Sequence, residues 1–302
     1  MSRDTEKVLR ELHAFMNENA DASMNEEKMN ELMKQFMSQY NSRVHEEITP
    51  ETAETSEDYM ELCENADNLA VKLKYARKAL QLDPDNLDAE RTVINFSTKT
   101  IYETIPLFQN AINHGKDVMA KMGYADDVGE YWGIFPTRPF IRMYCEYAQA
   151  LIDCRMMRRA ADALEEIIRL NTDDNTGRRF QLMHIYAYLE DEEKALALYN
   201  RYNGHPECQL LIPLSILYYK KGEYDQAYAY LKIAMDVNKD TRRFIRAMQK
   251  DGDLEDLVDD MPYGYRPYSI EEYYTEVIEN DFLFTDMDEY FEWALAMIKK
   301  KR

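Results

Sequence analysis

The sequence contains little glycine and little proline, with nine of each among 302 residues. β-Sandwiches and α/β enzymes use glycine in their turns and phosphate-binding loops, so this scarcity disfavours both classes. Ala, Leu, Met, Glu, Lys and Arg are abundant instead, and all of them form helices readily. The composition therefore predicts an all-α protein, long enough for one large core or for two domains.

The usual sequence signatures of enzymes and metal sites are missing. None of the four cysteines forms a Cys-x-x-Cys pair, and no two histidines stand three or four residues apart, so zinc, redox and helix-borne metal motifs are absent. Gly-x-Gly-x-x-Gly, the Walker A loop and Gly-x-Ser-x-Gly are absent as well. The sequence therefore predicts no catalytic residues, no cofactor and no metal site. The cysteines, expected to be free buried thiols in a reducing cytosol, are Cys63, Cys145, Cys154 and Cys208.

Basic residues are also scarce, since 37 Lys and Arg face 57 Asp and Glu for a formal net charge of −20. Nucleic acids and anionic membrane surfaces both reward positive charge, so neither is an expected partner. The longest apolar run, 210–219, includes Pro213 and is too short to cross a bilayer. We expect a cytoplasmic protein whose charge serves solubility alone or matches a basic or amphipathic partner.

One short phrase recurs along the chain. In residues 75–86 a helix with alanines three apart, Ala76 and Ala79, is followed by Pro84, which prevents continuation. Asp85 or Asn86 can then cap the next helix. Residues 167–175 repeat this phrase with threonine in place of proline, and residues 234–240 repeat it more weakly. Such a phrase is typical of the end of the second helix of a tetratricopeptide repeat (TPR).

A second signal lies upstream of these phrases, where a small residue is followed four positions later by a larger one. The spacing of the small residues is close to the TPR period of about 34 residues. We therefore predict three repeats over 141–238 and one divergent repeat over 53–86. Because a single helix pair cannot bury its own apolar face, the pairs should stack into a right-handed superhelical solenoid. The anchor pairs are Ala160/Leu164, Ala195/Tyr199 and Ala227/Leu231.

The order of the motifs resembles a family of bacterial TPR proteins. Trp132-Gly133 is followed by the Thr-Arg-Pro-Phe-Ile-Arg run of 137–142, and then by Leu-Asn-Thr-Asp-Asp-Asn-Thr-Gly at 170–177. The resemblance covers roughly residues 60–270 and leaves the N-terminal helices unmatched. It implies TPR-like antiparallel helix pairs and, because this group has no established catalytic role, an interaction scaffold or adaptor.

We divide the chain into four predicted parts. Residues 1–50 are an N-terminal helical pair, 51–130 are divergent TPR-like helices with a kink or break at Pro106, and 131–249 hold the three repeats. Residues 250–302 are an acidic capping region that would solubilise the last repeat. Trp132 and Phe135 are predicted to pack the irregular middle onto the repeats, with a ligand role as the alternative.

The leading functional hypothesis is a non-enzymatic scaffold whose concave groove holds a protein segment or peptide. The alternative is an intracellular peptide-sensing regulator that resembles the Gram-positive TPR receptors, with the N-terminal helices as an effector module. His184 could contact a ligand, or it could be a packed histidine with one hydrogen-bond partner. The predicted groove residues, which share the phase of the first helix of each repeat, are Arg142, Gln149, Phe180, Gln181, His184, Tyr188, Gln209 and Tyr219.

Overall fold

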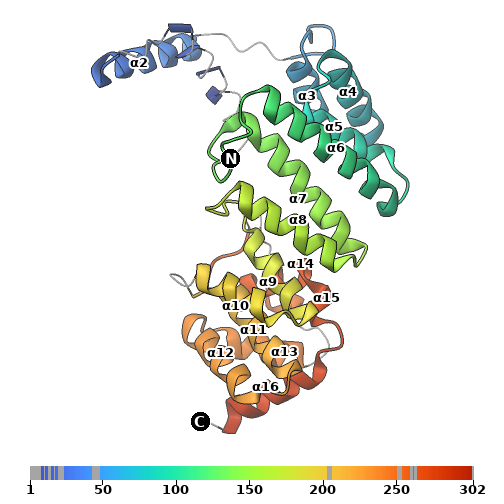
Figure 1. Cartoon of the computed structure of the whole chain (residues 1–302), viewed down its shortest axis with the longest axis vertical. Coiled ribbons are helices and arrows are strands. Elements are labelled where there is room, and N and C mark those ends of the chain that lie inside the picture. The colour runs from blue at the N-terminus through green and yellow to red at the C-terminus, as the bar shows by residue number, and fades with distance from the viewer. Residues whose placement is uncertain are drawn as a thin grey trace. The chain divides into compact units, whose positions relative to one another are not determined.

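The computed structural model is built from helices (Figure 1). It describes residues 8–9, 11–12, 15–16, 18–19, 24–42, 48–202, 206–249, 254–258, 261 and 264–300. Across these residues there are fifteen α-helices, α2 to α16, and no β-strand. The all-α prediction is confirmed. The first helix of the predicted N-terminal pair lies largely outside the described residues, as does the start of the acidic region at 250–253.

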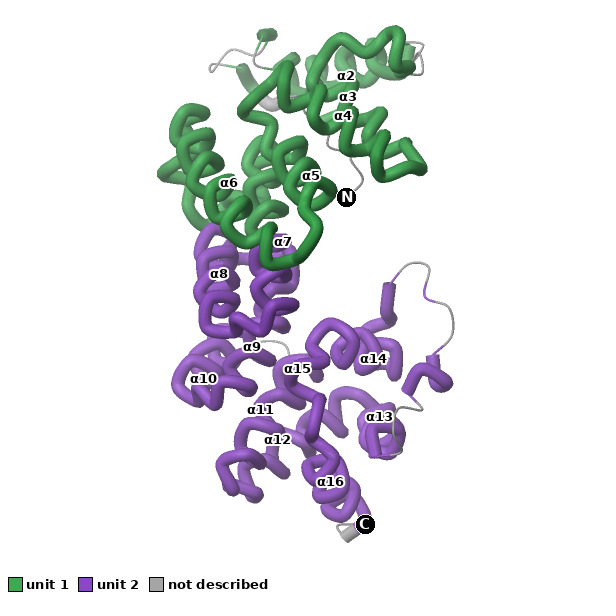
Figure 2. The backbone as a smooth tube through the Cα atoms, turned by 90° about the vertical axis from the view of Figure 1, so that its right-hand side faces the viewer, with its two compact units in different colours: residues 1–144 green, residues 145–302 purple. Residues whose placement is uncertain are grey.

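The chain forms two compact units, residues 1–144 and residues 145–302 (Figure 2). The division falls inside α7 (Arg138–Asp153). The boundaries that we predict at residues 50, 130 and 249 therefore stay predictions.

Unit 1 contains two helix hairpins, and polar caps fix where their helices begin. The hairpins are α3 (Ser56–Asn65) with α4 (Leu69–Leu82), and α5 (Leu87–Ser97) with α6 (Ile101–Lys121); α2 (Glu26–Ser42) precedes them. Thr55 and Asp58 form a reciprocal capping box on α3, and the Asn86 side chain caps α5. The predicted stop before Pro84 and the Asn86 cap are both confirmed.

Helix α6 runs without a break through Pro106. Of the predicted kink or break at this proline, the break is therefore wrong. Pro106 stands in the second turn of the helix, where its missing N–H removes a single hydrogen bond to a carbonyl of the first turn. The 21 residues of α6 bury an apolar face that includes Phe108 and Ile112, and this burial outweighs the loss of one hydrogen bond.

Small residues let the helices of unit 1 approach each other closely. Ala76 and Ala79 are fully buried in a cluster with Met60 and Cys63. Across the same contact the Ser56 hydroxyl donates to the Ala79 carbonyl at 3.0 Å. Elsewhere in unit 1, a Cβ atom added to Gly115 of α6 would lie 2.5 Å from Cδ2 of the Phe140 ring. Because real Cβ atoms do not approach a carbon so closely, only glycine fits at position 115.

We predict that Gly115→Ala destabilises unit 1 by about 1–3 kcal/mol, because the methyl group must displace the buried Phe140 ring. Thermal unfolding measures the effect, with Asn113→Ala on the exposed side of α6 as the matched control. Phe140→Leu removes the clashing ring atoms, so the double variant should recover part of the loss. Additive losses in the double variant would contradict the steric explanation.

Unit 2 continues with three further helix hairpins in the predicted order. Each predicted alanine anchor, Ala160, Ala195 and Ala227, lies on the second helix of a pair and is fully buried. Ser215 on the first helix of the last pair donates its hydroxyl to the Ala227 carbonyl at 2.8 Å. The buried alanines at the predicted spacing make these pairs TPR-like. The helices are the end of α7, α8 (Met157–Leu170), α9 (Arg178–Leu189), α10 (Glu192–Arg201), α11 (Cys208–Lys220) and α12 (Tyr224–Val237).

We predict that Ala227→Leu destabilises unit 2 by about 1–3 kcal/mol, because a larger side chain cannot enter a contact already packed against α11. The neighbouring Gln226 is exposed on the same helix, so Gln226→Leu should change the unfolding temperature little. Equal effects of the two substitutions in calorimetry would mean that the alanine contact does not limit the distance between the helices.

After α13 (Thr241–Met248), the C-terminal helices return to the first helices of the repeats. These helices are α14 (Ile270–Glu279), α15 (Asp281–Phe284) and α16 (Asp288–Lys300). They pack against α9, α11, α12 and α13 (Figures 1 and 2). Tyr273, Tyr290 and Phe291 are almost completely buried there. The prediction of a solubilising cap is incomplete, since this segment supplies part of the core of unit 2.

Candidate functional site

The predicted groove of unit 2 is occupied by the chain itself. Residues 264–300, which we call the resident segment, contact the first helices α9 and α11 of the last two repeats. Four of the predicted groove residues touch this segment. They are His184, Tyr188, Gln209 and Tyr219.

The centre of this contact is a hydrogen bond between His184 of α9 and Glu276 of α14. Both side chains are fully buried, and His184 Nε2 lies 3.1 Å from Glu276 Oε1. His184 Nδ1 lies 2.7 Å from the Phe180 carbonyl oxygen. A carbonyl oxygen can only accept, so the proton of the neutral imidazole is on Nδ1 and Nε2 is left as an acceptor.

Burial sets the protonation state of this pair. It lowers the pKa of His184 to about 4 and raises the pKa of Glu276 well above its ordinary value. Loss of water disfavours the charged form of each group. Glu276 is therefore a carboxylic acid that donates to His184. The expectation that His184 is a packed histidine with a partner is confirmed, although sequence reasoning did not identify Glu276.

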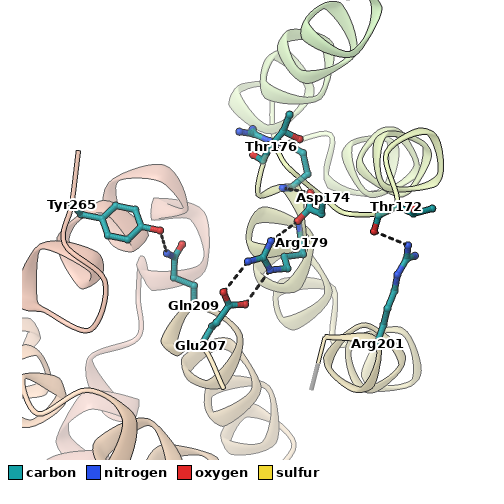
Figure 3. Close-up of polar contacts among 9 residues, drawn as sticks. Thr172, Asp174, Thr176, Arg179, Arg201, Glu207, Gln209 and Tyr265 are labelled. Carbon is teal, nitrogen blue, oxygen red and sulfur yellow. Dashed lines mark hydrogen bonds and ion pairs between the residues drawn. The ribbon is translucent and has the colours of Figure 1, made fainter. Parts of the chain in front are cut away.

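Tyrosine hydroxyls make three further hydrogen bonds to the groove. Tyr290 donates to Ser215 Oγ at 2.9 Å, and the hydroxyls of Tyr273 and Thr241 lie 2.7 Å apart. Gln209 Nε2 donates to the Tyr265 hydroxyl at 2.9 Å (Figure 3). Phenol groups therefore bind the resident segment at three positions along its sequence, 265, 273 and 290.

Aromatic rings fill the space between these polar contacts. Tyr188 meets Phe282 edge-to-face with ring centroids 5.6 Å apart, and Tyr219 lies 5.2 Å from Trp293. Phe244 of α13 stacks on Tyr273 at 4.3 Å. Aromatic pairs in such geometry contribute about 0.5–1.5 kcal/mol beyond the burial of their surface. These rings therefore pack the aromatic side chains of the resident segment against α9, α11 and α13.

A second group of contacts orders the start of α9 (Figure 3). Asp174 is buried, and its two carboxylate oxygens accept the backbone N–H groups of Arg178 and Arg179 at 2.7 and 3.0 Å. The Arg179 guanidinium donates to both oxygens of Glu207 at 3.0 and 2.8 Å. It also lies 4.1 Å above the Phe180 ring. The predicted groove residue Phe180 is therefore covered by Arg179.

Part of the groove stays open beside this network. A chain of hydrogen bonds joins Arg178 to Gln181 at 2.7 Å, Gln181 to Gln149 at 2.9 Å, and Gln149 to Asp153 at 2.8 Å. The predicted residues Gln149 and Gln181 are thus brought together. They line a cavity of about 310 Å³ whose other walls are Ile152, Asp153, Arg178, Ile278, Glu279 and Asp281.

Arg142, the remaining predicted residue, belongs to unit 1. Its guanidinium donates to both carboxylate oxygens of Asp88 at 3.0 and 2.6 Å. Arg142 and Asp88 line a cleft of about 410 Å³ together with Glu57, Asp83, Asp85, Lys121 and apolar side chains. Asp85 binds Lys121 and His114, which lowers its pKa. The apolar residues are Met60, Leu87, Val118, Met119, Met122, Phe135, Pro136 and Pro139.

The aromatic segment before α7 encloses an arginine. The Arg138 guanidinium lies 4.2 Å from the Phe135 ring centroid and 5.0 Å from that of Trp132. Its Nε donates to the Trp132 carbonyl at 2.7 Å. Inside unit 1 these two rings therefore order the entry to α7. Their predicted role in packing this region onto the repeats stays a prediction.

Among the described residues, no three His, Cys, Asp or Glu side chains are placed to hold a metal ion. In that same part of the chain, no helix combines the length and the apolar character needed to cross a membrane. Sequence reasoning missed the residues of the resident segment that fill the groove. The signal was present in the helical apolar faces around Tyr273 and Tyr290, which we assigned to a cap.

Comparison with known proteins gives similarity to solved structures alone. No protein-family model matches the chain, and no curated protein sequence matches it. One crystal structure of MamA is 19% identical, covers 62% of this chain and 94% of its own, and has a TM-score of 0.44. A second crystal structure of MamA is 20% identical, covers 56% of this chain and 87% of its own, and has a TM-score of 0.38. YrrB, described as a TPR protein with an unusual peptide-binding site, is 20% identical, with coverage of 61% and 86% and a TM-score of 0.39. Because these scores are low, the TPR-like assignment rests on the helix pairs and buried alanines of this chain.

We predict that Arg179→Lys destabilises unit 2 by about 1–3 kcal/mol, because a lysine cannot bind Asp174 and both oxygens of Glu207 at once. Chemical denaturation measures this loss. Arg201→Lys is the control, since Arg201 makes an exposed contact to the Thr172 carbonyl at 3.4 Å (Figure 3). If both substitutions had the same small effect, the Arg179 network would not contribute to stability.

Proposed function

We propose that this chain is a non-enzymatic TPR-like scaffold that binds a protein segment on the first helices of its repeats. The observation that carries the proposal is the resident segment itself. Predicted groove residues His184, Tyr188 and Tyr219 already hold a helical segment through a buried hydrogen bond and aromatic contacts. A surface that binds helices of its own chain has the chemistry to bind a helix of another protein.

The state of the buried polar pair supports a binding role over a catalytic one. A general base must reach the proton that it removes. His184 and Glu276 are both fully buried and bound to each other, so a substrate does not reach them while the resident segment is in place. Their chemistry serves to hold two elements together.

The cleft of unit 1 offers a second surface for the same function. Glu57 and Asp83 line a cavity together with methionines and a phenylalanine. This combination suits a basic or amphipathic segment, whose aliphatic stems would cover the apolar side chains while its charges meet the carboxylates. The net charge of −20 would also steer a basic partner towards the chain.

A peptide-sensing regulator is the second candidate, and the occupied groove favours it. In such a regulator an incoming peptide would replace the resident segment and so change the state of unit 2. This candidate needs an effector, which we placed in the N-terminal helices. Most of the first of these helices lies outside the described residues.

Site-specific photo-crosslinking tests the scaffold function in cells that express the full chain. A benzoylphenylalanine in place of Tyr188, a side chain 41% exposed at the edge of the groove, should capture a separate protein. Excess synthetic peptide of residues 264–300 should suppress that adduct, because the two segments compete for one surface. The adduct is measured by mass spectrometry.

The matched control carries the same crosslinker at Tyr102, a 62% exposed tyrosine of unit 1. At Tyr102 the crosslinker should give no adduct with that protein that the peptide suppresses. Identical adducts at both positions, or adducts at position 188 that the peptide leaves unchanged, would rule out the groove as the binding surface.

A further inference from the structure

Three polar side chains that face the resident segment, His184, Ser215 and Thr241, have each already donated their proton within their own part of the chain. His184 Nδ1 donates to the Phe180 carbonyl at 2.7 Å, and Ser215 donates to the Ala227 carbonyl at 2.8 Å. The Thr241 hydroxyl donates to the carbonyls of Ala234 and Asn238. A hydroxyl or a neutral imidazole has one such proton. At these three positions an occupant therefore meets lone pairs, whereas Gln209 and Asn238 donate to the Tyr265 hydroxyl and the Ser269 carbonyl.

An occupant must then supply the donors, and the resident segment does so. Tyr290 donates to Ser215 and Tyr273 to Thr241, while Glu276 donates to His184. The two phenols suit this task, because a tyrosine hydroxyl keeps its proton at neutral pH. The carboxyl group suits it poorly, because a carboxyl in water has lost its proton at the same pH.

The site around Glu276 is also incompletely satisfied. Glu276 Oε2 and Asn280 Oδ1 are buried without a hydrogen-bond partner. An unpaired buried acceptor weakens the docked state, because it has lost its hydrogen bonds to water. The resident segment therefore binds well through its aromatic residues and its phenols, and poorly at the position of Glu276.

We propose that residues 264–300 are an exchangeable occupant of this groove, and that the partner replacing them is an aromatic amphipathic helix with a neutral hydrogen-bond donor where Glu276 lies. A glutamine amide or a phenol meets this requirement. The inference rests on the proposed scaffold function and names the chemistry of its partner. A lysine or arginine at this position is excluded, because its charge would be buried beside a neutral histidine. This groove therefore selects a different class of segment from the acidic cleft of unit 1.

The ionisable groups that act on Glu276 and His184 lie on α9, α11, α14 and α16. They are His184 of α9, Cys208 of α11, Glu272, Tyr273 and Glu279 of α14, and Tyr290 of α16. Burial raises the pKa values of Cys208, Tyr273 and Tyr290 above ordinary values that already lie at or above 9. These three groups stay neutral between pH 6.5 and 8.5. Burial also raises the pKa of Glu272 to about 7, so Glu272 titrates together with the pair.

The number of protons held in the docked and the released states decides how the affinity for the resident segment depends on pH. When the segment is released, Glu276 and His184 titrate near their ordinary pKa values of 4.5 and 6.5. Between these values both states hold one proton, on His184 when released and on Glu276 when docked. Above pH 6.5 the released state loses its proton, whereas the raised pKa of Glu276 makes the docked state hold its proton to higher pH. Docking through Glu276 therefore weakens as pH rises, by up to about tenfold per pH unit.

Labelled synthetic peptides of residues 264–300 test the proposal against the full-length chain. We expect the native peptide to bind by exchange, and the Glu276→Gln peptide to bind more tightly. The affinity ratio of the Gln peptide to the native peptide should rise at least tenfold between pH 6.5 and pH 8.5, as measured by fluorescence anisotropy. Glu272 is present in both peptides and in the resident segment, so its titration cancels from this ratio.

Three further peptides probe the donor requirement at single atoms. Glu276→Lys should bind at least tenfold more weakly than Glu276→Gln at pH 6.5, because it would bury a charge. Tyr290→Phe should weaken binding about three- to tenfold, which corresponds to one hydrogen bond. The matched control is Tyr268→Phe, since Tyr268 is 54% exposed, and it should bind like the native peptide.

The outcomes separate this inference from the function on which it rests. If no peptide bound the full chain, exchange would be overturned, whereas photo-crosslinking at Tyr188 would still decide the scaffold function. If the affinity ratio of the Gln peptide to the native peptide did not change with pH, the neutral donor at position 276 would be overturned.

In the full chain, Glu276→Gln should raise the unfolding temperature more at pH 8.5 than at pH 6.5. An equal shift at both values would contradict the proton count.

Discussion

The hydrogen bond between His184 and Glu276 is the constraint on which unit 2 depends. It joins two residues that are 92 positions apart in the sequence, and burial keeps both groups neutral in it. The aromatic contacts around it bury surface without direction, whereas this bond fixes which helix lies where. The resident segment is therefore positioned by a proton that water would otherwise remove.

The local features of the fold could be predicted from the sequence because their causes lie within a few residues. Pro84 stops a helix by its own ring, Asn86 caps the next helix through its own side chain, and Ala160 is small enough for a close helix contact. The partner of His184 could not be predicted, because nothing near position 184 indicates a carboxylic acid at position 276. The aromatic face of α16 was visible, but a periodic pattern does not say which surface it covers.

The two polar pairs at the predicted groove residues Arg142 and His184 differ in their charge. In unit 1 Arg142 forms an ion pair with Asp88, which is itself largely buried, and both residues line a cleft. In unit 2 burial leaves His184 and Glu276 without charge. A scaffold with both surfaces would distinguish its partners by the environment that each offers, since a cation suits the first surface and a neutral donor suits the second.

The position of the resident segment in the chain has a consequence for folding. Helices α9 and α11 are synthesised well before α14 and α16, which must cover them. During that interval their aromatic and imidazole groups face water or other proteins. Unit 2 can complete its core only when its last residues arrive, so its formation depends on contacts of long sequence separation, which form slowly. A nascent chain would therefore show to chaperones the surface that the resident segment covers in the finished protein.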